Sequence, residues 1–141
     1  METNRSVREQ VIKDIKRAFE SCELDVKKWS SGIPALLNVD CDFPAVSVSL
    51  HQGENTEGLD STVRAQLMVR ILVAANHELD DELDKYGQRI LDVLVPQESD
   101  YTAASHLDVC NFVGFDYSRD DSQPWGALDI IFNIEYGFIY D

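Results

Sequence analysis

The residues best suited to chemistry gather in one polar loop near the C-terminus, within GFDYSRDDSQPWGALDIIFNIEY at positions 114–136. Asp116, Asp120 and Asp121 could together gather a divalent cation, which would activate a water molecule for hydrolysis. They lack the ligand spacing, the central glycine and the closing glutamate of an EF-hand loop. A carboxylate acting as general acid or base also needs a desolvated cleft, whereas a hairpin turn is normally exposed. A divalent-metal hydrolase therefore remains the less favoured alternative.

The same loop supports a second interpretation, because it also holds Arg119 and Trp125. Tryptophan and arginine are the residue types that most often anchor protein–protein interfaces. Trp125 could equally fold back onto its own sheet, and the sequence does not separate these two alternatives. The loop therefore predicts either a contact with another protein or a local cap on the fold.

No other part of the chain offers a catalytic set. The three histidines, His51, His77 and His106, have no second histidine or cysteine at metal-binding spacing. The acidic string HELDDELD at positions 77–84 is better explained as the start of a helix, where the dipole favours negative charge. The sequence contains no phosphate-binding glycine loop, nucleophile elbow or paired CxxC motif. These residues therefore give little support to catalysis, and by themselves they do not indicate a biological role.

The net charge and the cysteine content limit which partners and which cell compartment the protein can have. Twenty-six Asp and Glu residues against twelve Lys and Arg give a net charge of −14, which repels nucleic-acid backbones and anionic lipids. The three cysteines are an odd number with no CxxC spacing, and the N-terminus has no apolar signal segment, so we expect free thiols in a reducing cytosol. We expect a single domain over residues 1–141, with no membrane contact and no sequence-specific nucleic-acid partner.

Apolar periodicity predicts the elements that must position these residues. Spacings of three and four predict helices over residues 4–23 and 80–94, and alternation predicts strands over 45–50, 62–74, 107–117 and 127–140. Residues 25–44 predict short extended pieces and turns, and 51–60 a mobile loop. The order predicts an α+β fold, a mostly antiparallel sheet with two helices packed on one face.

The strand over residues 62–74 is unusually long for a chain of 141 residues. At roughly 3.4 Å per residue it would span about 44 Å, whereas a compact chain of this size has a diameter of about 37 Å. We therefore expect a projecting β-hairpin whose edges are covered by a neighbouring subunit. We also expect the sheet face away from the helices to be partly apolar, because Met68, Leu72, Phe132 and Ile134 cannot all lie under the helices.

Four segments together resemble the phage lambda tail terminator (minor tail protein U) family. They are DFPAVSVSL (42–50), GLDSTVRAQLMVRILV (58–73), DDELDKYGQRI (80–90) and the segment at 114–136 quoted above. The resemblance covers most of the chain from about residue 40 onward, while residues 25–41 and 96–106 match poorly. The resemblance implies a hexameric ring, without catalysis or cofactor, that caps the completed tail tube and offers a surface for joining the head.

The resemblance also implies partners and a location. The chain would contact copies of itself, the major tail tube protein and a head-completion or connector protein, at the head-proximal end of the virion tail after assembly in the host cytoplasm. We assign an assembly surface to seven residues as a hypothesis: Arg64, Met68, Arg70, Arg119, Asp120, Asp121 and Trp125. Because a ring of acidic subunits repels itself, we expect magnesium to strengthen oligomerisation. Another phage neck or head-completion ring protein remains an alternative.

Overall fold

The computed structural model describes residues 2–34, 37–55, 62–95, 107–119 and 123–137. The elements in chain order are α1 (Glu2–Ser21), β1 (Lys28–Ser31), α2 (Val39–Asp42), β2 (Ala45–Asn55), β3 (Thr62–Ala74), α3 (Leu79–Leu94), β4 (Val109–Arg119) and β5 (Trp125–Gly137). The strands form one sheet in the order β1-β2-β3-β5-β4. Only the short β1–β2 pair is parallel. The predicted α+β fold with a mostly antiparallel sheet is confirmed.

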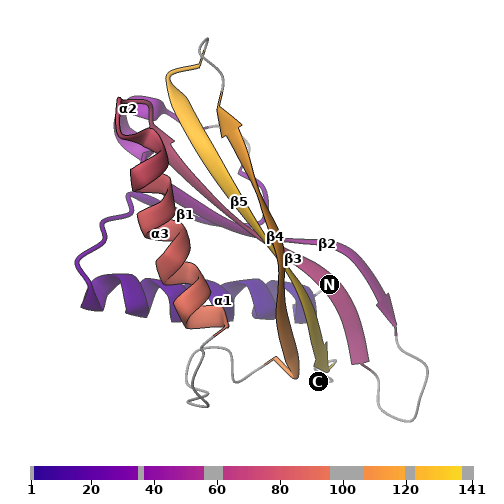
Figure 1. Ribbon diagram of the computed structural model, residues 1–141. Helices are drawn as coiled ribbons and strands as arrows, with labels where there is room; N and C mark the ends of the chain where they lie inside the picture. The colour runs from indigo at the N-terminus through magenta and orange to yellow at the C-terminus, as the bar shows by residue number, and fades with distance from the viewer. Residues whose placement is uncertain (1, 35–36, 56–61, 96–106, 120–122, 138–141) are drawn as a thin grey trace.

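Helices α1 and α3 lie on the same face of the sheet (Figure 1). Helix α1 contacts β1, β2 and α3, whereas α3 contacts β3 and β5. Alternate residues of β3, from Val63 to Val73, turn toward the helices and are buried, as the alternation predicted. Phe132 and Ile134 of β5 are also under the helices, at 0% and 1% exposure. They pair with Leu67 and Ala65 of β3 and share the face of those residues. Met68 and Leu72 lie on the opposite face, so the four residues do not all lie under the helices, as expected.

The apolar stripe of α1 explains how the N-terminal helix is held. Val11 and Ile15 are completely buried, and the Phe19 ring packs against the rings of Trp29 in β1 and Tyr86 in α3 at centroid distances of 5.7 and 5.6 Å. At the other end, the Tyr136 hydroxyl of β5 donates a hydrogen bond to Asn4 Oδ1 at 2.7 Å. Helix α1 is therefore fixed at both ends, over residues close to the predicted 4–23.

Helix α3 lies close to β5 because of a glycine. A Cβ atom at Gly87 would lie 2.7 Å from Leu128 Cδ2, which is shorter than a normal van der Waals contact. Glycine lowers helix propensity by about 1 kcal/mol relative to alanine, so its presence mid-helix has a packing reason here. The acidic first turn, Asp80, Asp81 and Glu82, lies where the string HELDDELD predicted a helix start.

The β2–β3 hairpin is longer than the sequence indicated. The residues from His51 to Asn55, expected to be loop, continue β2 through a register shift between His51 and Glu54, where Gln52 has a φ of 45°. Figure 1 shows the end of this hairpin extending away from the helices. Strand β5 runs beside β3 for its whole length, from Trp125 opposite Ala74 to Gly137 opposite Thr62. The projecting part of the sheet is therefore three-stranded rather than the simple two-stranded arm expected.

Candidate assembly surfaces

The sheet face away from the helices, called the open face below, carries polar side chains in rows across the strands. Backbone register aligns one row of uncharged or weakly basic groups, His51, Gln66, Asn133 and Asn111. The adjacent row contains Met68 beside Ile131, and the row after it contains Arg70 beside Asp129. Three of the predicted assembly residues, Arg64, Met68 and Arg70, therefore share this one face.

Ion pairs neutralise part of the charge on the open face. Arg70 binds Asp129 through two hydrogen bonds, with Nε 2.6 Å from Oδ1 and Nη2 2.9 Å from Oδ2. This hydrogen-bonded pair raises the pKa of the Arg70 guanidinium, although burial opposes the shift. Arg64 forms a single contact of 2.5 Å with Glu135, and this hydrogen bond also raises the pKa of Arg64. Both arginines are thus already paired within the chain.

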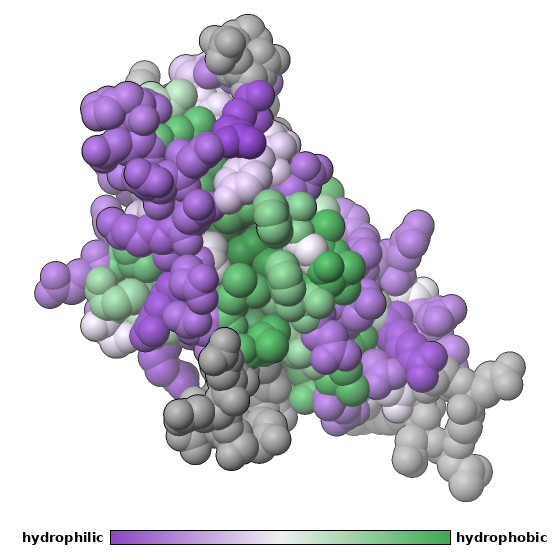
Figure 2. Space-filling view, in the orientation of Figure 1, coloured by the Kyte–Doolittle hydropathy of each residue, from purple (hydrophilic) through white to green (hydrophobic). Residues whose placement is uncertain are grey.

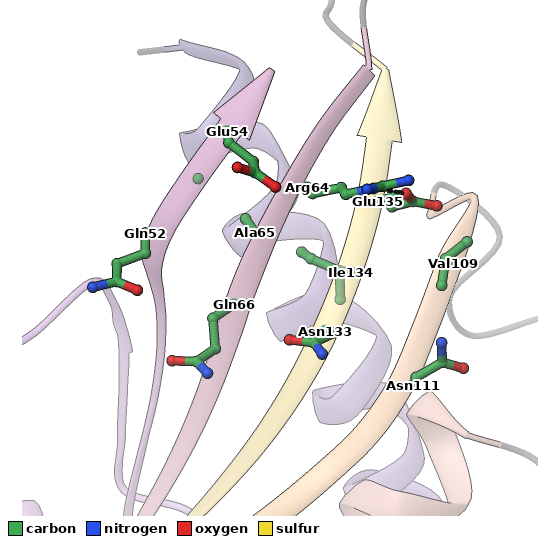
Figure 3. A pocket seen from close by; sticks show the side chains of 11 residues that line it. Gln52, Glu54, Arg64, Ala65, Gln66, Val109, Asn111, Asn133, Ile134 and Glu135 are labelled. Atoms are coloured by element: carbon green, nitrogen blue, oxygen red, sulfur yellow. Dashed lines mark hydrogen bonds and ion pairs between the residues drawn. The ribbon is translucent and has the colours of Figure 1, made fainter. Parts of the chain in front are cut away.

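A shallow concavity of about 740 Å³ opens on this face near the hairpin end (Figure 3). Figure 3 shows the amide side chains of Gln66, Asn133 and Asn111 on adjacent strands, with the Arg64–Glu135 pair beyond them. Amides both donate and accept hydrogen bonds, but they carry no charge and are not nucleophiles. The concavity therefore suits contact with another polypeptide better than acid–base or covalent chemistry.

Trp125 lies at the other end of the open face, in a small second hydrophobic cluster. Phe43, Ala45, Leu72 and Ala127 are buried there, and the Trp125 ring meets the Phe43 ring edge-on at 6.5 Å. Trp125 thus packs on its own sheet, which was one of the two alternatives that the sequence left open. Its side chain is only partly buried, and a role in an interface stays a prediction.

A hydrophobic groove lies on the helix side, between α3 and the edge strand β4. The α3–β4 groove is a cavity of about 250 Å³ lined by Gly87, Leu91, Phe112, Phe115, Leu128 and Ile130, with polar residues at its rim. Phe112 is 44% exposed and Phe115 is 63% exposed. Figure 2 shows hydrophobic residues gathered on this part of the surface, with hydrophilic residues on both sides. In the described part of the chain, the two exposed phenylalanines therefore lie beside α3 rather than on the open face.

A β-bulge places both phenylalanines on the helix side of β4. The register of β4 on β5 shifts between Phe112 and Gly114, so Val113 is the extra residue. Phe112 then pairs with Phe132, and Phe115 with Ile130, which places both phenylalanines on the helix side although they are three residues apart. The alternation expected over 107–117 missed this site. The glycine within the run FVGF was the available signal, since a glycine inside a strand often marks a bulge.

Charged and aromatic side chains close one end of the α3–β4 groove. The Tyr117 hydroxyl donates a short hydrogen bond to Asp84 of α3, and Arg119 pairs with Asp80 while its guanidinium lies 4.5 Å from the Tyr117 ring centre. The hydrogen bond to Asp84 raises the pKa of Tyr117 to about 12. Arg119, a predicted assembly residue, is therefore tied to α3 and does not share a surface with Arg64, Met68 and Arg70.

The aspartates proposed for a hydrolase are only partly placed. Asp116 is exposed on the open face opposite Asp129, whereas Asp120 and Asp121 lie outside the described residues. In the part of the chain that is described, no group of three His, Cys, Asp or Glu residues could hold a metal ion. The same residues include no helix long and apolar enough to cross a bilayer.

The described residues thus define a class of protein: an α+β chain whose prominent surfaces suit contact with other chains. The fold is similar to a chain in the solved structure "Virion of native gene transfer agent (GTA) particle", with a TM-score of 0.56, 11% identity, and coverage of 88% of this chain and 92% of that one. No curated protein matches the sequence.

A match to a protein-family model shows which family the protein belongs to. The family described as phage minor tail protein U matches residues 2–136, almost the whole chain, and the protein belongs to it. The match includes helix α1, which lies before the residues that carried the resemblance, as well as residues 25–41, which had matched poorly.

Proposed function

We propose that this protein is a tail terminator, a hexameric ring that caps the tail tube of a long-tailed phage and ends its polymerisation. The observation that carries the proposal is the match to the phage minor tail protein U family over residues 2–136. In this role the ring binds the major tail tube protein on one side and a head-completion or connector protein on the other. Its place is the head-proximal end of the virion tail, after assembly in the host cytoplasm.

The surfaces support a structural role. The α3–β4 groove exposes aromatic side chains, and the open face offers a polar concavity on a rigid sheet. Capping needs only geometry: one ring face complementary to the tube end, and an opposite face without a site for another tube ring. Neither surface needs a catalytic group or a cofactor for this task.

Charge should make ring formation dependent on ions. Six copies of a chain of −14 would carry −84, and salt or divalent cations screen such repulsion. We expect light scattering to show larger assemblies as magnesium is added. Monomers at every magnesium and protein concentration would contradict the proposal for the isolated protein.

Complementation tests the terminator role directly. A phage lacking its own terminator should regain tails of normal length when this chain is supplied, whereas the uncomplemented control makes overlong tails, as measured by electron microscopy. Normal-length tails that fail to join heads without this chain would instead favour another neck or head-completion ring protein. Retained assembly by Asp120→Ala and Asp121→Ala variants, with loss of a measurable hydrolysis, would favour the metal hydrolase.

A further inference from the structure

The α3–β4 groove needs an occupant, because aromatic side chains as exposed as Phe115 are unfavourable in water.

The opposite edge of the sheet offers a complementary surface. Strand order places β1 at one edge and β4 at the other. Directly after β1, Ile33 is 73% exposed, the largest exposure among the large hydrophobic side chains described. Lys28 and Ser31, the first and last residues of β1, are exposed as well, and Arg8 of α1 donates a hydrogen bond to Ser31 Oγ at 3.1 Å. We call Lys27, Lys28, Ser31 and Ile33 the β1 edge.

The N-terminal segment that contains β1 differs in net charge from the rest of the chain. Residues 1–31 hold seven of the twelve Lys and Arg residues and six of the twenty-six Asp and Glu residues, a net charge of +1. Residues 32–141 hold the remaining five and twenty, a net charge of −15. Helix α3, which forms one wall of the groove, has five acidic and two basic residues. Lys27 and Lys28 of the β1 edge and the acidic residues of α3 carry opposite charge, which favours association of the two surfaces and orients it.

We propose that the α3–β4 groove of one copy receives the β1 edge of the next copy, with Ile33 seated against Phe112 and Phe115. This inference rests on the proposed ring and names the contact that would close it. The contact joins two different surfaces, so a pair of chains leaves one groove and one edge unused. Such heterologous contacts continue until the ring closes, whereas a contact between identical surfaces stops at a dimer.

Disulfide trapping on assembled particles tests the contact. The chain would carry Ile33→Cys and Phe115→Cys in a background where the exposed Cys22 and Cys41 are serine. Particle-bound protein, oxidised and run on a non-reducing gel, should give a ladder of up to six linked chains. Either cysteine alone should give no ladder. Absence of the ladder on particle-bound protein overturns the inference alone, whereas absence of the wild-type chain from tails overturns the proposed function and the inference with it.

Mixing two defective variants shows whether the contact is head-to-tail. Phe115→Ser and Ile33→Asp should each weaken association by on the order of 10-fold or more, as loss of a buried hydrophobic anchor does. Val113, which is 51% exposed on β4 and outside the lining of the groove, gives the matched control Val113→Ser, which should assemble normally. An equimolar mixture of the two defective variants should form a 1:1 dimer and nothing larger, because one groove and one edge remain intact. Normal rings from either variant would overturn the inference.

Discussion

The α3–β4 groove and the open face differ in how the fold treats their side chains. On the open face, Arg70 is paired with Asp129, and the apolar cluster at its end is covered by Phe43. In the groove, Phe112 and Phe115 are left without cover, because α3 lies over β3 and β5 and stops short of β4. The difference shows that the helix layer is narrower than the sheet. Among the described residues, exposed aromatic side chains therefore occur at the edge of the helix layer, in the α3–β4 groove, and not on the open face.

The largest expected effect separates the aromatics that stabilise the fold from those left for a partner. Phe132 is completely buried on β5, and Phe132→Ala should lower the free energy of unfolding by about 3–5 kcal/mol. Phe115→Ala should lower it by less than about 1 kcal/mol, because its side chain is mostly in water already. Urea denaturation of both variants measures this. Equal losses would mean that the groove is part of the core.

A second prediction concerns the two ion pairs of the open face. Asp129→Ala removes a buried carboxylate and leaves Arg70 half-buried without its partner, so we expect a loss of about 1–3 kcal/mol in unfolding free energy. Glu135→Ala is the matched control, since Glu135 pairs with the well-exposed Arg64, and its loss should be clearly smaller and salt-dependent. If Glu135→Ala proved the more costly, this account of the open face would be wrong.

A third prediction tests the end of the groove. Tyr117→Phe removes the hydrogen bond to Asp84 and should cost about 0.5–1 kcal/mol at neutral pH. Because the fold raises the pKa of Tyr117 to about 12, its stabilisation is complete below the ordinary value near 10. It is lost as the pH rises toward 12. The difference between wild-type and Tyr117→Phe stability should therefore shrink over that range, and a difference that grew would contradict the assignment.

The smallest expected effect concerns the reactivity of Cys110, which lies near the start of β4. Burial raises the pKa of the Cys110 thiol to about 11 from a usual 9.0, so its thiolate fraction at pH 8 falls roughly 100-fold. Alkylation followed by mass spectrometry should modify the exposed Cys22 and Cys41 first. Cys110 reacting as fast as those two would show that the strand opens well beyond Phe112.

Side-chain periodicity predicted most of the fold. Strand β3 spans the predicted residues 62–74, and α3 begins one residue before the predicted helix, because each has an uninterrupted apolar pattern. The continuation of β2 past His51 was missed, since Gly53 and its polar neighbours are typical of loops, while backbone pairing with β3 holds them in the sheet. The parallel β1–β2 pair was not foreseen either, because four residues are too few to show a period.

The candidate surfaces were harder to predict than the fold. Arg64, Met68 and Arg70 lie together because they alternate on one strand, and alternation is visible in sequence. Their ion partners Glu135 and Asp129 come from a strand about sixty to seventy residues away, and only the register of β3 on β5 brings them together. Phe112 and Phe115 were missed because their shared face depends on a bulge, and exposure depends on how far α3 extends.

The extra residue Val113 also affects how relatives should be aligned. Deleting it would remove the bulge and keep Phe115 opposite Ile130 on the helix side, because residues two apart in a regular strand share a face. A family member one residue shorter at this point is therefore expected to carry its second aromatic two residues after the first, aligned with Phe115 when the gap is placed at Val113. A gap placed elsewhere in the strand would compare side chains from opposite faces.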